Sequence, residues 1–108
     1  MSAKEISRAA LSEALLSRSP PVVIEALDRK YYDSGHIPTA RMLPPADVAR
    51  VASMVADKEQ AIVVYCASAT CRNSHQAAAD LEKLGYRNVA VYAGGKADWV
   101  EGGLRLER

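Results

Sequence analysis

A short apolar run at residues 61–65 ends directly at a cysteine, Cys66. Every position of the run is apolar, which is typical of a strand buried on both faces at the centre of a parallel sheet. Small and polar residues follow, and from Ser74 onward apolar residues recur at helical spacing. This order predicts a thiol at the carboxyl end of a strand, the edge at which open α/β sheets bind ligands. Free backbone N–H groups and the dipole of the following helix favour an anion there, and so favour the nucleophilic thiolate form of Cys66.

Strands and helices are predicted to alternate along the whole chain. Short apolar runs predict strands at residues 22–24, 42–43 and 89–92, and helical spacing predicts helices over residues 48–55 and 74–84, with a short one around Trp99. Ser2 and Glu5 have the form of a capping box, which predicts that an N-terminal helix begins there and ends before residue 18. Residues 25–37 are interpreted as a loop, and Gly85 is expected at a helix C-terminus.

This alternation indicates an α/β fold with a small, mainly parallel central sheet covered by helices on both faces. The length of 108 residues fits one domain over residues 1–108, with the N-terminal helix within 1–18 and the core within 22–104. Right-handed crossovers would bring Cys66 and the turns after Ile24 and Tyr92 to one edge of the sheet. The expected pocket therefore consists of residues 66–74, 25–36 and 93–96.

Charge and composition exclude several classes of partner. Lys and Arg number 14 against 13 Asp and Glu, a net charge of +1 that argues against nucleic-acid or membrane binding driven by bulk charge. The N-terminus lacks the apolar segment of a secretory signal, so we expect a cytoplasmic location. The two cysteines and two histidines do not have a familiar zinc spacing, and we expect no metal.

Three segments in order resemble the rhodanese (sulfurtransferase) domain family. The first joins residues 22–25 to the turn at residues 31–40, which is similar to the family's "GHIPGA" signature. The second is the strand that ends at Cys66, and the third combines residues 85–89 with the Gly94, Gly95 and Trp99 pattern. The resemblance runs from about residue 22 to residue 104 and implies the family's three-layer α/β/α fold.

The resemblance also implies a chemistry. Such domains take a sulfane sulfur onto the cysteine as a persulfide and pass it to a thiophilic acceptor, without a metal or organic cofactor. Cys66 would be the nucleophile here, and the substrate would be bound by backbone amides and side chains of Ala67, Ser68, Ala69, Thr70, Cys71 and Arg72. Glu25, His36 and Ser74 are secondary candidates. The implied partners are a small sulfur donor, such as thiosulfate or a persulfide, and a thiol or protein acceptor.

The loop after Cys66 departs from the common pattern of the family. Five residues separate Cys66 from Arg72, where the family often has four, and the segment from Cys66 to Gly85 is about two residues longer than the common form of the family. This Cys-x5-Arg spacing matches cysteine phosphatases and some arsenate reductases, in which arginine binds a phosphate-sized anion. Phosphate or arsenate chemistry is therefore an alternative function, and a non-enzymatic redox-sensing or partner-binding module is another.

Cys71 and two positions of the first motif also depart from the family pattern. Cys71 stands where many rhodaneses have arginine, and it could be a resolving thiol that attacks a persulfide or sulfenate on Cys66. We favour a small residue that fills a tight turn, because a wide anion-binding loop would hold the two thiols too far apart for a disulfide. Glu25 replaces the usual aspartate, and Thr39 replaces the glycine of the "GHIPGA" turn.

Overall fold

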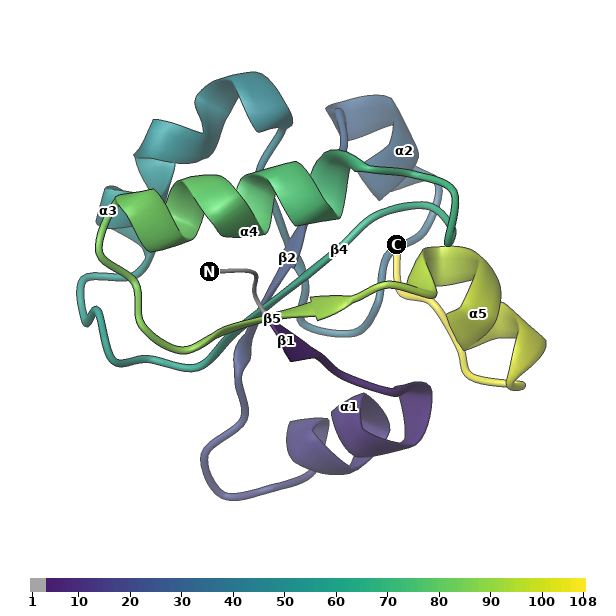
Figure 1. Cartoon of the computed structure of the whole chain (residues 1–108). Coiled ribbons are helices and arrows are strands. Elements are labelled where there is room, and N and C mark those ends of the chain that lie inside the picture. Colours follow the sequence, from purple (N-terminus) through teal and green to yellow (C-terminus); the bar gives the residue numbers. More distant parts are fainter. Residues whose placement is uncertain (1–3) are drawn as a thin grey trace.

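A computed structural model describes residues 4–108, which form a five-stranded sheet with helices on both faces (Figure 1). The strands are β1 (Lys4–Glu5), β2 (Val22–Glu25), β3 (Arg41–Met42), β4 (Ile62–Tyr65) and β5 (Val89–Tyr92). Their order is β1-β5-β4-β2-β3, and every pairing is parallel. The α/β fold and the parallel sheet expected from the sequence are confirmed, with β4 at the centre.

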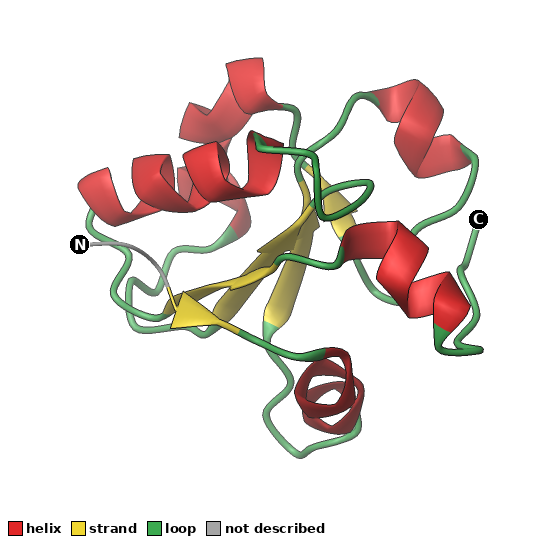
Figure 2. Ribbon diagram, turned by 45° about the vertical axis from the view of Figure 1, so that its right-hand side comes forward, coloured by secondary structure: helices red, strands yellow, loops and turns green. Residues whose placement is uncertain are grey.

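Helices connect the strands and form the two outer layers (Figure 2). They are α1 (Arg8–Leu15), α2 (Arg29–Asp33), the 3-10 helix η1 (Pro45–Arg50), α3 (Val51–Met54), α4 (Asn73–Lys83) and α5 (Gly95–Glu101). The first turn of α4 and the Gly85 terminus agree with the sequence prediction, since Gly85 has a φ of +99° directly after the helix cap. No helix within residues 4–108 is long and apolar enough to cross a membrane.

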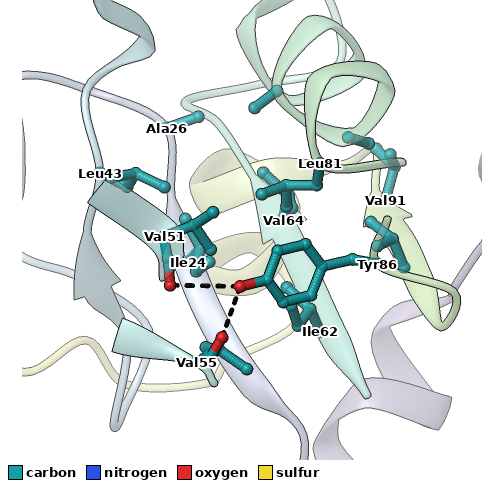
Figure 3. Close-up of a cluster of buried hydrophobic side chains, with 13 residues drawn as sticks. Ile24, Ala26, Leu43, Val51, Val55, Ile62, Val64, Leu81, Tyr86 and Val91 are labelled. Carbon is teal, nitrogen blue, oxygen red and sulfur yellow. Dashed lines mark hydrogen bonds between the residues drawn. The ribbon is translucent and has the colours of Figure 1, made fainter. Parts of the chain in front are cut away.

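Alternate residues of the central strand supply two separate cores. Ile62 and Val64 face α3 and α4, where a cluster of buried side chains surrounds Tyr86 (Figure 3). The Tyr86 hydroxyl donates to the carbonyl oxygens of Val51 and Val55, which satisfies a buried polar group at this face (Figure 3). Val63 and Tyr65 face the opposite side, where they pack with Leu11 of α1 and Trp99 of α5, among others. A strand with both faces buried is therefore apolar throughout, as the run at residues 61–65 predicts.

The N-terminal helix was predicted to begin at the wrong residue. Glu5 lies in β1 and is paired with Val91 of β5, so it does not cap a helix; Ser2 lies outside the described residues. The helix begins at Arg8, and its N-cap is Ser7, whose hydroxyl accepts from the Ala10 amide at 3.1 Å. Backbone pairing with β5 gives the groups of residues 4–5 that face it hydrogen-bond partners, which explains why a strand replaces the first helical turn.

Residues 25–37 are not only a loop, because they contain α2. The carbonyl oxygen of Asp28 accepts from the amides of Tyr31 and Tyr32, which starts this short helix. None of its residues is fully buried, so it has no apolar face that periodicity could reveal. The predicted helix over residues 48–55 is also divided, into η1 and α3, with Asp47 in a non-helical conformation.

One edge of the sheet collects the predicted pocket segments. Glu25 pairs with Tyr65, and Tyr65 pairs with Tyr92, so β2, β4 and β5 end side by side. The turns that follow these strands, including the one that carries Cys66, therefore meet at the carboxyl edge, as the crossover argument predicts.

Candidate active site

Cys66 and Cys71 form a disulfide at the carboxyl edge of the sheet. Cys66 directly follows β4 and is buried, with 1% of its surface exposed, whereas Cys71 is partly exposed just before α4. Their Cα atoms are 6.1 Å apart, inside the range that a disulfide spans. The expectation that a wide loop would hold the two thiols apart was therefore wrong.

The loop between the cysteines is compact because it folds back on itself. The Cys71 amide donates to the Ser68 carbonyl oxygen at 3.1 Å, and the hydroxyls of Ser68 and Thr70 are hydrogen-bonded at 3.1 Å. The side chains of Ala67 and Ala69 are small and exposed, so they do not hinder the turn sterically. With the disulfide formed, the Cys71 amide is used inside the loop. The role of the amides at residues 67–72 in binding a substrate anion stays a prediction.

Backbone amides at the beginning of α5 bind the first residues of the cysteine loop. The Lys96 amide donates to the Cys66 carbonyl oxygen at 3.1 Å, and the Ala97 amide donates to the Ala67 carbonyl oxygen at 3.0 Å. Gly95 allows this approach: its φ is +67°, and a Cβ at this position would collide with the Cys66 carbonyl oxygen and lie 2.9 Å from the Ser68 nitrogen. The Gly-Gly turn after β5 thus fixes the backbone of Cys66 and Ala67.

A buried charged network lies at the ends of β2 and β4. Glu25 is fully buried, and its Oε1 accepts from the Tyr65 hydroxyl at 2.6 Å. The same hydroxyl accepts from the Ile37 amide at 3.0 Å. Lys96 Nζ is 3.0 Å from Glu25 Oε2 as an ion pair without hydrogen-bond alignment, and it donates to the Tyr31 carbonyl oxygen at 2.5 Å.

This network raises the pKa of Tyr65 far above its usual range. Burial is the main cause, and the hydrogen bond and negative charge of Glu25 add to it. Tyr65 therefore stays neutral, and its hydroxyl donates a hydrogen bond to the carboxylate of Glu25. Sequence reasoning assigned no role to Tyr65 and included Lys96 only in the expected pocket range 93–96. The available signal was a lysine directly after the two glycines, at the edge where Glu25 was a secondary candidate.

The candidate residues after the loop differ in their exposure to solvent. Arg72 is the N-cap of α4; its side chain is exposed and forms no ion pair within the described chain. Ser74 is buried in the first turn of α4, and Asn73 donates from Nδ2 to the Ala26 carbonyl oxygen at 3.2 Å, which ties this helix to the end of β2. Arg72 and Ser74 thus both follow the disulfide directly along the chain.

His36 has structural contacts. Its ring stacks on Tyr32 with 3.9 Å between ring centroids, and Nδ1 lies 3.1 Å from the Tyr32 carbonyl oxygen. Its backbone pairs with Glu107, which attaches the C-terminal segment to the turn before β3. These contacts account for the burial of His36, and a role for it in the site stays a prediction. No group of three or more His, Cys, Asp or Glu side chains in residues 4–108 has the arrangement of a metal site.

The fold and sequence are similar to those of known proteins. A rhodanese-like domain from Anabaena sp. is 31% identical with a TM-score of 0.73, covering 82% of this chain and 99% of that one. A rhodanese from E. coli solved with anions is 33% identical with a TM-score of 0.65, covering 72% of this chain and 89% of that one.

A larger protein shows the same fold. A thiosulfate sulfurtransferase from Pseudomonas aeruginosa is 23% identical with a TM-score of 0.81, covering 98% of this chain and 20% of that one. No curated protein matches the chain. The family model of the rhodanese-like domain matches residues 8–102, which include the cysteine loop and the turn that holds it. With nearly the whole chain matched, this protein belongs to the rhodanese-like domain family.

Proposed function

We propose that this protein is a sulfurtransferase that carries a sulfane sulfur as a persulfide on Cys66. The supporting observation is the position of Cys66, which is buried at the end of the central strand, bonded to Cys71 just before α4, and held through its carbonyl oxygen by the Lys96 amide. This position combines a fixed sulfur with the positive end of an 11-residue helix. An anionic thiolate or persulfide is stabilised in such surroundings.

The reaction requires the reduced form of the loop. The Cys66 thiolate attacks the outer sulfur of thiosulfate, the bond between the two sulfurs of thiosulfate breaks, and sulfite leaves with the electron pair. A thiol or cyanide then attacks the terminal sulfur of the persulfide, and Cys66 leaves as the thiolate. The thiolate itself supplies the chemistry, so the proposal involves no cofactor.

The donor is proposed to be a small anion with a transferable sulfur. Arg72 is exposed beside the loop without an ion pair in the described chain, so its guanidinium is available for an oxyanion such as thiosulfate. The E. coli relative is named a rhodanese and was solved with anions, which supports anion binding in this family member. We place the reaction in the cytoplasm, where disulfides are kept reduced.

Sulfite release tests the proposal without depending on the fate of the persulfide. Reduced wild-type protein and Cys66→Ser are each incubated anaerobically with thiosulfate, and sulfite is measured over time. We expect about one equivalent from the wild type in the absence of acceptor, and none above background from Cys66→Ser. Equal release from both proteins would contradict the proposal.

Phosphate or arsenate chemistry is the second candidate. The observation that favours it is the exposed guanidinium of Arg72, which five residues separate from Cys66. Turnover of an aryl phosphate by the reduced protein, lost in Arg72→Ala and in Cys66→Ser, would support this alternative. Sulfite release from thiosulfate together with no phosphate release would exclude it. A protein inactive in both assays that still forms its disulfide reversibly would be a redox-sensing module.

A further inference from the structure

Two features of the cysteine pair suggest a role beyond carrying sulfur. The disulfide uses the sulfur of Cys66, so the bond and the persulfide cannot exist at the same time. The ring that it closes is short, and a disulfide stabilises a fold least when it closes a short loop. A bond that blocks the reactive sulfur and adds little stability is better explained as a step of the reaction than as a structural link.

The backbone that allows the bond is positioned by other contacts. The Lys96 and Ala97 amides hold the carbonyl oxygens of Cys66 and Ala67, and the Ser68 carbonyl oxygen holds the Cys71 amide. These hydrogen bonds involve only backbone groups, so they do not depend on the oxidation state of the sulfurs. The two thiols of the reduced protein therefore stay within reach of one another.

We propose that Cys71 is a resolving thiol that converts the sulfur carrier into a persulfide reductase. This inference rests on the proposed persulfide on Cys66. The Cys71 thiolate attacks Sγ of Cys66, the bond between Sγ and the terminal sulfur breaks, and hydrosulfide leaves with the electron pair. The sulfane sulfur gains two electrons, and the two cysteines lose them as the Cys66–Cys71 disulfide forms. The proton of Cys71 passes to solvent or to the leaving sulfur.

Surroundings of Cys71 favour this attack. It lies at the amino end of α4 and is followed by Arg72, whose exposed guanidinium is not used in an ion pair among the described residues. Both features favour the thiolate, which is the attacking form. A transferred sulfur in this protein would therefore be released as hydrosulfide before an external acceptor is needed.

A dithiol reductant completes the cycle. The unequal burial of the two cysteines determines which sulfur of the disulfide the reductant attacks. Cys66 is 1% exposed and Cys71 is partly exposed, so an incoming thiol reaches the Cys71 sulfur first. Attack there forms a mixed disulfide on Cys71 and frees Cys66 as the thiolate, ready for the next donor. The second thiol of the reductant then releases Cys71. The sum of the steps converts thiosulfate and a dithiol into sulfite, hydrosulfide and a disulfide.

The test compares three reduced proteins with thiosulfate under anaerobic conditions, without added reductant: wild type, Cys71→Ser and Cys66→Ser. Sulfite, hydrosulfide, free thiols and intact mass are measured. We expect the wild type to release equal amounts of sulfite and hydrosulfide and to lose the mass of two hydrogens. Cys71→Ser should release sulfite alone and gain the mass of one sulfur at Cys66. Cys66→Ser should do neither.

The outcomes separate this inference from the proposed function. If the wild type keeps a stable persulfide with Cys71 free and releases no hydrosulfide, the resolving role is overturned while sulfur transfer stands. If neither wild type nor a folded Cys71→Ser releases sulfite, both are overturned. A second measurement does not use a variant at either cysteine: the oxidised wild type is treated with limiting monothiol and mapped by peptide analysis. A mixed disulfide on Cys71 supports the proposed direction, and one on Cys66 contradicts it.

Discussion

Lys96 is linked to Glu25 by an ion pair of 3.0 Å between Nζ and Oε2, and its own amide holds the carbonyl oxygen of Cys66. One residue of α5 thus joins a fully buried carboxylate at the end of β2 to Cys66 at the end of β4. The charge of Glu25 is compensated by a side chain that is itself only 14% exposed. Breaking this pair should therefore be costly.

Lys96→Met retains most of the side-chain volume and leaves Glu25 buried without its cation. We expect the free energy of unfolding to fall by about 3 kcal/mol, measured by urea denaturation. Lys83→Met, on an exposed lysine of α4, is the matched control and should change it by less than about 0.5 kcal/mol. Adding Glu25→Gln to Lys96→Met should recover part of the lost stability, since no unpaired buried charge remains. Equal effects of the two lysine substitutions would contradict the assignment.

Alkaline pH should destabilise the protein through its buried tyrosines. The pKa values of Tyr65 and Tyr92 are raised, by burial first and then by hydrogen bonds to Glu25 and Asp98. In the unfolded chain these groups ionise near pH 10, while in the folded protein they stay protonated. Stability is then fully present below about pH 10 and falls above it, by up to about 1.4 kcal/mol per pH unit for each such tyrosine.

Urea titrations between pH 8 and about 11 measure that slope. Tyr65→Phe should make it shallower and should lower stability at neutral pH by about 2 kcal/mol, because Glu25 and the Ile37 amide lose a partner. Tyr31→Phe, at a side chain that is 44% exposed, should leave both the slope and the neutral stability nearly unchanged. Parallel slopes for wild type and Tyr65→Phe would refute this account.

Gly95→Ala tests the contact that holds the cysteine loop. A Cβ at position 95 would meet the backbone of residues 66–68, and the φ of +67° is unfavourable for alanine. Gly103 is a matched control, because its φ is +82° but no atom lies within 4 Å of an added Cβ. We expect Gly103→Ala to cost about 1 kcal/mol of stability with normal sulfite release. Gly95→Ala should cost more and should slow sulfite release roughly tenfold or more, because the Cys66 backbone must move.

Thr39→Gly should stabilise the protein. Thr39 has a φ of +71°, the only positive value at a non-glycine residue in the described chain. It stands where the rhodanese signature has glycine, so the backbone has kept the left-handed conformation although the side chain opposes it. We expect a gain of about 1 kcal/mol, reduced somewhat by the greater freedom of glycine in the unfolded chain. Thr39→Ala retains a Cβ and should gain less; an equal gain would show that the branched side chain alone causes the strain.

Local sequence patterns correctly predicted the central strand and the position of Cys66 at the edge of the sheet. The run at residues 61–65 identified the central strand because both of its faces are buried, and parallel topology then brought Cys66 to the edge with the turns after β2 and β5. α2 was missed because none of its residues is fully buried, and the first helix was started too early because the pairing of residues 4–5 with β5 joins distant parts of the chain.

The cysteine pair and its support depend on distances that no local pattern contains. Cys71 reaches Cys66 because the loop folds back to Ser68 while amides about thirty positions later, at residues 96–97, hold its first carbonyl groups. The partner of Glu25 was hidden for the same reason, since the ion pair joins residues 25 and 96. Spacing alone suggested a wide loop, and three-dimensional contacts make it a narrow one.

The strictly parallel order of the strands also has a practical use. Because every strand points the same way, the segment that leads into β2 lies at the opposite edge of the sheet from Cys66. Residues 16–20 of that segment are all exposed. A fluorophore or a short epitope inserted there would sit across the full length of the strands from Cys66, which makes this turn a suitable attachment point for labelling or immobilising the protein without touching the cysteine loop.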